Sequence, residues 1–159
     1  MAGPIRVDRD LVKRYPTAEK AATEAVINLV RAESLVAGRL NRRFRRHGLS
    51  LATFNVLMIL EGADEPLCPA EIGSRLLVTR GTVTGLLDSL EKLSLIRRVP
   101  NPDDRRMLRI EMTRAAHTLL SRLLPDHFAG EAEMLAGLTE REKETLIRLL
   151  GKVQDTLDR

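Results

Sequence analysis

Apolar side chains recur every three or four positions along most of this chain, the spacing that places them on one face of an α-helix. The first such stretch is predicted to begin at a Thr17 cap and to run to about Arg46. His47-Gly48 should end it, because Gly accepts the left-handed conformation. The polar residues before it, 1–16, are expected to form a loose arm. The apolar stripe of this helix comprises Ala22, Val26, Leu29, Val36, Leu40 and Phe44.

Three shorter helices are predicted next. Ser50 caps a segment that is apolar around most of its circumference and should therefore be buried. Cys68-Pro69-Ala70-Glu71 has the layout of a capping box, with Cys in place of the usual Ser or Thr, and the helix that follows should end near Leu77. Thr79 caps the third helix. Its expected buried stripe comprises Val83, Leu86, Leu87, Leu90 and Leu93.

The pattern then changes from helical spacing to alternation. Residues 95–99 and 107–112 alternate apolar with polar side chains, as half-buried strands do, and Pro100-Asn101-Pro102 between them indicates an exposed loop. Thr113 caps a long helix, and Thr139 with Glu142 forms a full capping box for the last one. The predicted fold is mainly α, with six helices and a small β-hairpin.

Two short helices joined by a tight turn and followed by an arginine-tipped hairpin form a winged helix-turn-helix, which places a helix in a DNA major groove. At this point, in LDSLEKLSLIRR followed by PNPDDRRMLRIEMT, the chain resembles the MarR family of bacterial winged-helix regulators. The resemblance extends more weakly from about Lys20 to the C-terminus. It implies a winged helix-turn-helix DNA-binding lobe over 49–113 and a helical dimerisation region over 17–48 and 114–159.

The helix that begins after Thr79 is the candidate for the major groove. With its apolar stripe facing inward, its opposite face presents a set of small or hydrogen-bonding residues and one Arg. Gly in a helix is less stable than Ala by about 1 kcal/mol, so close approach to DNA explains the glycines better than stability does. Asp88 and Glu91 would repel phosphates, so only the first half should enter the groove. The presented residues are Arg80, Gly81, Thr82, Thr84 and Gly85.

The hairpin tip is the second candidate contact. Asp104-Arg105-Arg106 matches the Asp-x-Arg wing motif of the family, which implies that Asp104 braces Arg106 and that Arg106 enters the minor groove. Arg105 is then available for phosphate, although the two arginines could exchange roles. Arg97 and Arg98 at the base of the strand are further phosphate candidates. The alternative is an ordinary charged turn.

Composition narrows the class of partner. A net charge of +4 would not by itself predict nucleic acid, but Arg39–Arg46 holds five arginines and no acid, which suits phosphate contacts or a solvated helix face. Aromatic residues at 3% and the absence of Trp exclude a stacking platform for single strands. The chain shows no run of about 18 apolar residues, so no membrane partner is expected. It shows no secretory signal, and its one cysteine fits a reducing cytoplasm.

Other chemistry has weak support. Cys68 at a helix N-terminus could be an oxidant sensor, but a structural thiol is the preferred interpretation. His127 and Glu131 have the i, i+4 spacing of a metal pair, and we interpret them as part of a solvated helix face. No arrangement of nucleophile and base and no phosphate-binding Gly loop is present, so neither an enzyme nor a cofactor is predicted.

The sequence therefore predicts a regulator that binds double-stranded DNA as a homodimer, most simply a repressor. The long flanking stripes exceed what a small lobe can cover, and a second copy would bury them. The family resemblance implies a small aromatic or anionic effector, which Arg42, Arg43 and His47 could meet. Alternatives are a DNA-coating architectural protein, a redox-responsive repressor using Cys68, and a winged helix used for protein contacts. The expected dimer contacts are Val26, Leu29, Leu146, Leu149, Leu150, Val153 and Leu157.

Overall fold

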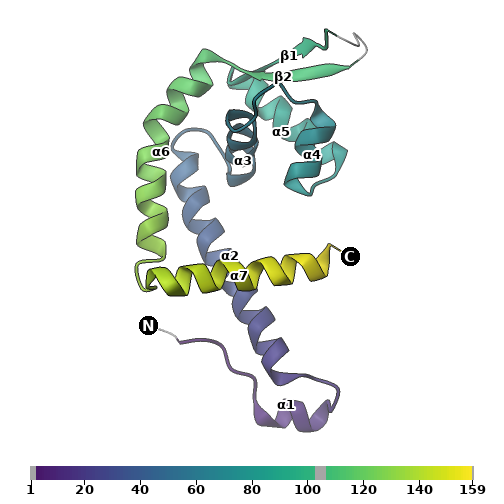
Figure 1. The fold of residues 1–159 in the computed structure, drawn as a ribbon, viewed down its shortest axis with the longest axis vertical. Coiled ribbons are helices and arrows are strands. Elements are labelled where there is room, and N and C mark those ends of the chain that lie inside the picture. The colour runs from purple at the N-terminus through teal and green to yellow at the C-terminus, as the bar shows by residue number, and fades with distance from the viewer. Residues whose placement is uncertain (1–2, 103–106, 159) are drawn as a thin grey trace. The chain divides into compact units, whose positions relative to one another are not determined.

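The computed structural model describes residues 3–102 and 107–158, shown as a ribbon in Figure 1. The chain divides into two compact units, Met1–Met112 and Thr113–Arg159. The first unit contains the winged lobe together with the first long helix. All six helices expected from the sequence are present, together with the hairpin, and a further short helix lies near the N-terminus.

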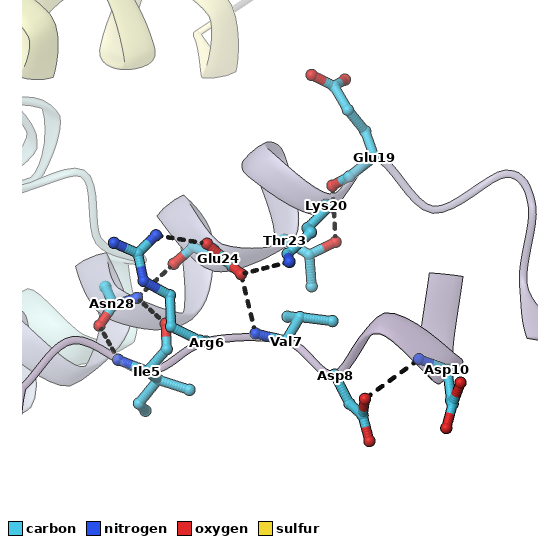
Figure 2. A network of polar contacts seen from close by, with 10 residues as sticks. All are labelled: Ile5, Arg6, Val7, Asp8, Asp10, Glu19, Lys20, Thr23, Glu24 and Asn28. Atoms are coloured by element: carbon cyan, nitrogen blue, oxygen red, sulfur yellow. Dashed lines mark hydrogen bonds and ion pairs between the residues drawn. The ribbon is translucent and has the colours of Figure 1, made fainter. Parts of the chain in front are cut away.

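The short helix is α1, Arg9–Arg14, capped by the Asp8 side chain. Residues before it run along the first long helix, α2, Lys20–Arg45 (Figure 2). The Asn28 side chain accepts a hydrogen bond from the Ile5 backbone N–H at 2.8 Å and donates one to the Ile5 carbonyl at 2.9 Å. The prediction of a loose arm over 1–16 is therefore wrong for the residues around Ile5, because polar side chains of α2 bind their backbone.

Glu24 is the second anchor of this arm. Its carboxylate accepts hydrogen bonds from Arg6 Nη1 at 2.8 Å and from the Val7 backbone N–H at 3.0 Å, and Lys20 Nζ lies 3.8 Å away (Figure 2). The Arg6 hydrogen bond is the main cause, and the Val7 hydrogen bond the next, of a pKa of Glu24 below its usual 4.5. A buried carboxylate is thus satisfied by the arm that it holds.

The start of α2 also differs from the sequence-based prediction. Glu19 occupies the N-cap position without a side-chain hydrogen bond, whereas Thr17 was expected to cap the helix. The end of the helix agrees, because Gly48 adopts the left-handed conformation with φ +72°. Phe44 near this end stacks on Phe54, with ring centroids 4.1 Å apart. This pair joins α2 to the winged lobe.

The lobe consists of α3, Leu51–Glu61, α4, Pro69–Leu76, and α5, Arg80–Lys92, packed together beside the hairpin (Figure 1). Ser50 and Thr79 cap α3 and α5 as predicted, through hydrogen bonds from the backbone N–H groups of Thr53 and Thr82. Cys68 is the N-cap residue of α4. The core of the lobe comprises Phe44, Val56, Leu57, Ile72, Val83, Leu87, Leu90, Ile96 and Ile110, all nearly inaccessible to solvent.

The wing is an antiparallel pair of strands, β1, Ile96–Pro100, and β2, Leu108–Met112. Its register places Ile96 opposite Met112 and Arg98 opposite Ile110. Leu67 forms an isolated bridge with Ile110, which attaches the hairpin to the segment before α4. Ser94, between α5 and β1, has φ +56°, a left-handed conformation that Gly adopts more readily than Ser.

The second unit contains α6, Arg114–Met134, and α7, Glu140–Leu157. Thr113 and Thr139 cap them as predicted, and the Glu142 carboxylate accepts a hydrogen bond from the Thr139 N–H at 2.8 Å. His127 is buried in α6, and its Nε2 lies 3.2 Å from Glu131 Oε1. The prediction that His127 belongs to a solvated helix face is therefore wrong. Among the described residues, no helix is long and apolar enough to cross a membrane.

Candidate nucleic-acid interface

The first two turns of α5 present the residues that the sequence analysis placed in the major groove. Arg80, Gly81, Thr82, Thr84 and Gly85 are all exposed, whereas Val83 and Leu87 are buried on the opposite side of the helix. The Thr84 hydroxyl donates a hydrogen bond to the Arg80 carbonyl at 3.1 Å within the helix. The result is a helical face of low profile with one guanidinium at its N-terminal end.

The glycines of this face differ from a glycine required for packing. A Cβ added to Gly73 in α4 would lie 3.0 Å from Val83 Cγ2, so tight contact between α4 and α5 explains that glycine. A Cβ on Gly81 would come no closer than 4.0 Å to Thr79 Oγ1, and one on Gly85 would meet no described atom within 4 Å. Packing within the lobe therefore does not require glycine at 81 or 85.

The turn between α4 and α5 carries an apolar residue that the sequence analysis did not single out. Leu77 has φ +54° and its side chain is 82% exposed. It lines an open cleft together with Arg80, Pro69, Gly73 and Val83. The sequence could have indicated this conformation. The helix that ends at Leu76 and the cap at Thr79 are so close together that the connection needs a left-handed residue.

The second half of α5 is acidic, and Arg98 binds both acids. Arg98 Nη2 lies 2.6 Å from Asp88 Oδ1, and Arg98 Nη1 donates to Glu91 Oε2. The Arg98 side chain is only 24% exposed. From the sequence, Arg98 is expected to contact phosphate and the two acids are expected to repel it. The structure instead brings the three charges together.

Arg97 lies on the other face of β1 and is 68% exposed. Its Nη2 is 2.6 Å and its Nε 2.8 Å from Glu111 Oε2 on the neighbouring strand. An exposed pair of this kind contributes little to stability and its arginine can exchange partners. Arg97 thus remains a candidate for a phosphate contact. The tip of the wing, with Asp104, Arg105 and Arg106, lies outside the described residues.

Two further groups of predicted residues lie elsewhere. In the arginine cluster of α2, Arg39, Arg42, Arg45 and Arg46 are exposed and Arg43 is half-buried, which fits either phosphate binding or a solvated face. The predicted dimer contacts leave long apolar stripes on the single chain. Val26, Leu29, Leu146, Leu149, Val153 and Leu157 are exposed, and Leu150 is half-buried.

Cys68 is the remaining candidate for chemistry, and Leu86 and Leu93 are the remaining positions of the predicted apolar stripe of α5. Cys68 is half-buried, and its backbone N–H donates to Glu71 Oε2 at 2.7 Å. That hydrogen bond, followed by one from the thiol, lowers the pKa of Glu71. Leu93, expected in the buried stripe of α5, is 43% exposed because it is the C-cap residue, where the helical period ends. Leu86 is half-buried.

Known proteins share this sequence pattern and this fold. The model of the MarR family matches residues 47–107. The transcriptional regulator PecS of Dickeya dadantii is 33% identical over 131 residues, 81% of this chain and 79% of PecS. The transcriptional repressor YetL of Bacillus subtilis is 28% identical over 144 residues, 90% of this chain and 86% of YetL. The crystal structure of AbsC, a MarR family regulator of Streptomyces coelicolor, superposes with a TM-score of 0.82 at 16% identity, covering 89% and 97% of the two chains.

Proposed function

Because this chain belongs to the MarR family, whose members are transcriptional regulators and not enzymes, we propose that it is a homodimeric repressor that binds a pseudo-palindromic operator and is released by a small molecule. Its partner is double-stranded DNA, on which it would act in the cytoplasm. The observation that carries the proposal is the exposed first half of α5, with two glycines that packing does not require.

Each part of the interface has a distinct role in this proposal. Arg80 binds a guanine edge or a phosphate at the N-terminal end of α5, and the threonine methyl groups contact thymine. Gly81 and Gly85 let the backbone of the helix approach the floor of the groove. Arg97 binds phosphate beside the wing. At the wing tip, Asp104 orients Arg106 toward the minor groove and Arg105 binds phosphate.

The proposed dimerisation is supported by the apolar stripes of the single chain. Exposed leucines and valines at helical spacing on α7, and Val26 and Leu29 on α2, support a self-complementary interface with a second copy. A twofold axis sets the distance between two α5 helices. Half-sites about 34–36 Å apart would then lie on the same face of the duplex.

Release by an effector is supported by proteins of the same fold. CouR of Rhodococcus jostii RHA1 has been crystallised bound to p-coumaroyl-CoA, and 6-hydroxynicotinic acid regulates DNA binding by BpsR of Bordetella bronchiseptica. For this chain we propose an aromatic or anionic effector. It acts as a switch only if it binds the DNA-incompetent arrangement more tightly than the DNA-bound one.

Selection of random duplex DNA by the purified full-length protein tests this function. The expected result is an inverted repeat with half-site centres separated by about one helical turn. Recovery of no preferred sequence, together with a steep salt dependence of binding, would instead identify a DNA-coating architectural protein. Failure to retain duplex DNA at low salt would contradict DNA binding altogether.

A further inference from the structure

The candidate contact residues of α5 continue into its acidic half along one line of the helix. Arg80, Thr84, Asp88 and Glu91 follow one another at spacings of four, four and three residues, which places them on one stripe. The same side of the helix that offers a guanidinium and a methyl group to DNA therefore ends in two carboxylates. Duplex DNA carries about one negative charge per 1.7 Å, so bare carboxylates on this stripe would oppose binding.

Arg98 reaches this stripe because of its position in the wing. Residues 96, 98 and 100 of β1 share one face of the hairpin, and Ile96 and Ile110 on that face are buried in the lobe core. Arg98 is consequently directed toward α5, whereas Arg97 lies on the opposite face and pairs across the hairpin with Glu111. From its inward position, the Arg98 guanidinium binds Asp88 with one nitrogen and Glu91 with another.

We infer that Arg98 is a positioning residue for DNA recognition, which neutralises the acidic end of the α5 stripe and fixes the first wing strand to it. It does not itself bind phosphate. One guanidinium changes the net charge of the group from −2 to −1. Because it binds Asp88 and Glu91 together, it also links β1 to the second half of α5. This inference rests on the proposed DNA-binding function.

A comparison of variants in two backgrounds tests the inference. Arg98→Met keeps an unbranched apolar side chain but removes the guanidinium and its charge, and Asp88→Asn with Glu91→Gln removes the charges that it binds. Operator affinity is measured by fluorescence anisotropy on the selected operator at about 50–200 mM salt. Arg98→Met should weaken binding by about tenfold or more when the acids are present, and by less than about threefold when they are absent.

A loss of affinity in Arg98→Met is not sufficient evidence, because removal of any positive charge near DNA weakens binding, most strongly at low salt. The decisive result is whether the loss depends on the presence of Asp88 and Glu91. Arg97→Met is the matched control, since it removes a neighbouring guanidinium that does not touch Asp88 or Glu91. It should weaken binding by the same factor in both backgrounds. If Arg98→Met also weakens binding equally in both backgrounds, Arg98 contacts DNA directly and the inference is wrong.

A second measurement without DNA separates failure of the inference from failure of the proposed function. In thermal unfolding, Arg98→Met should destabilise the parent more than the variant that lacks both acids, because it leaves two carboxylates without their shared partner. Equal decreases of the unfolding temperature in both backgrounds would show that the clamp, Arg98 bound to Asp88 and Glu91, does not form in solution. If the parent binds no operator but this coupling is present, the proposed function fails while the clamp itself stands.

Discussion

At the scale of single residues, Gly85 separates the requirements of folding from those of DNA binding. The lobe has room for a methyl group there, and Ala is favoured over Gly in a helix by about 1 kcal/mol. Gly85→Ala should therefore raise the free energy of unfolding and at the same time weaken operator binding, because the methyl group enters the space assigned to the groove. Thermal unfolding and anisotropy on the same samples measure the two effects.

Gly38→Ala in α2 provides the control, because its added methyl group would meet only the Arg42 side chain at 3.8 Å. It should stabilise the protein and leave operator affinity unchanged. A Gly85→Ala protein that binds its operator as tightly as the parent would show that this side of α5 does not closely approach DNA.

Glu24 makes the attachment of the N-terminal arm depend on pH. Hydrogen bonds from Arg6 and Val7 lower its pKa in the folded protein below the usual 4.5. The attachment is therefore fully present above pH 4.5 and is lost as pH falls through the lowered pKa. The Val7 amide resonance, followed by NMR during acidification, should shift in that acidic range. In Glu24→Gln this transition should disappear, and an identical titration in both proteins would assign it to another group.

Sequence analysis placed the outward residues of α5 correctly because helical spacing alone separates them from Val83 and Leu87. It did not predict the ion pairs of Arg98 with Asp88 and Glu91, because Arg97 and Arg98 were both interpreted as phosphate contacts. Alternation along β1 puts Arg97 and Arg98 on opposite faces, and only the register with Ile110 shows which face is buried. The arm was missed for a related reason, since Glu24 and Asn28 look like ordinary polar residues until Ile5 and Val7 lie beside them.

At the scale of elements, local hydrogen bonding determined most boundaries. Ser50, Thr79, Thr113 and Thr139 were predicted as caps, and each side chain accepts a hydrogen bond from the backbone of the helix that it begins. Thr17 failed as a cap because α2 begins three residues later, after a turn that the sequence does not specify. A cap can be predicted when a polar capping residue is followed closely by an apolar stripe at helical spacing, as Thr79 is followed by Val83.

The cap of α4 gives a test of the cysteine. Ser is a better N-cap than Cys, so Cys68→Ser should retain operator binding and raise stability by up to about 1 kcal/mol. Both proteins are titrated with operator before and after treatment with peroxide. Release of the parent by peroxide, with the Ser variant remaining bound, would identify Cys68 as a redox sensor and overturn the structural interpretation.

The wing is tested at its tip. Arg106→Ala should weaken operator binding by about 1–3 kcal/mol without changing the far-ultraviolet circular dichroism spectrum, because the hairpin is held at its base by Ile96 and Ile110. Arg105→Ala, the neighbouring control, should have a smaller effect that is similar for all sequences, as expected of a phosphate contact. Equal affinity of the Arg106 variant and the parent at fixed salt would remove the wing tip from the mechanism.

At the scale of the whole molecule, the exposed apolar stripes are the basis of the proposed homodimer. A single chain leaves Leu157 78% exposed, with Leu149 and Val153 also exposed on α7. Periodicity predicted these positions, because apolar residues at helical spacing continue past the winged lobe. Periodicity could not predict how two copies pair, since that depends on the shape of an interface made by separate chains.

The stoichiometry of the protein on its selected operator tests the central claim most directly. Sedimentation velocity of a labelled duplex should show a single complex that contains two chains, unchanged when flanking DNA is lengthened. A variant lacking residues 138–159 should lose both this complex and stability, because α7 supplies much of the proposed interface. One folded chain bound tightly to the operator, or a number of chains that grows with DNA length, would contradict the account.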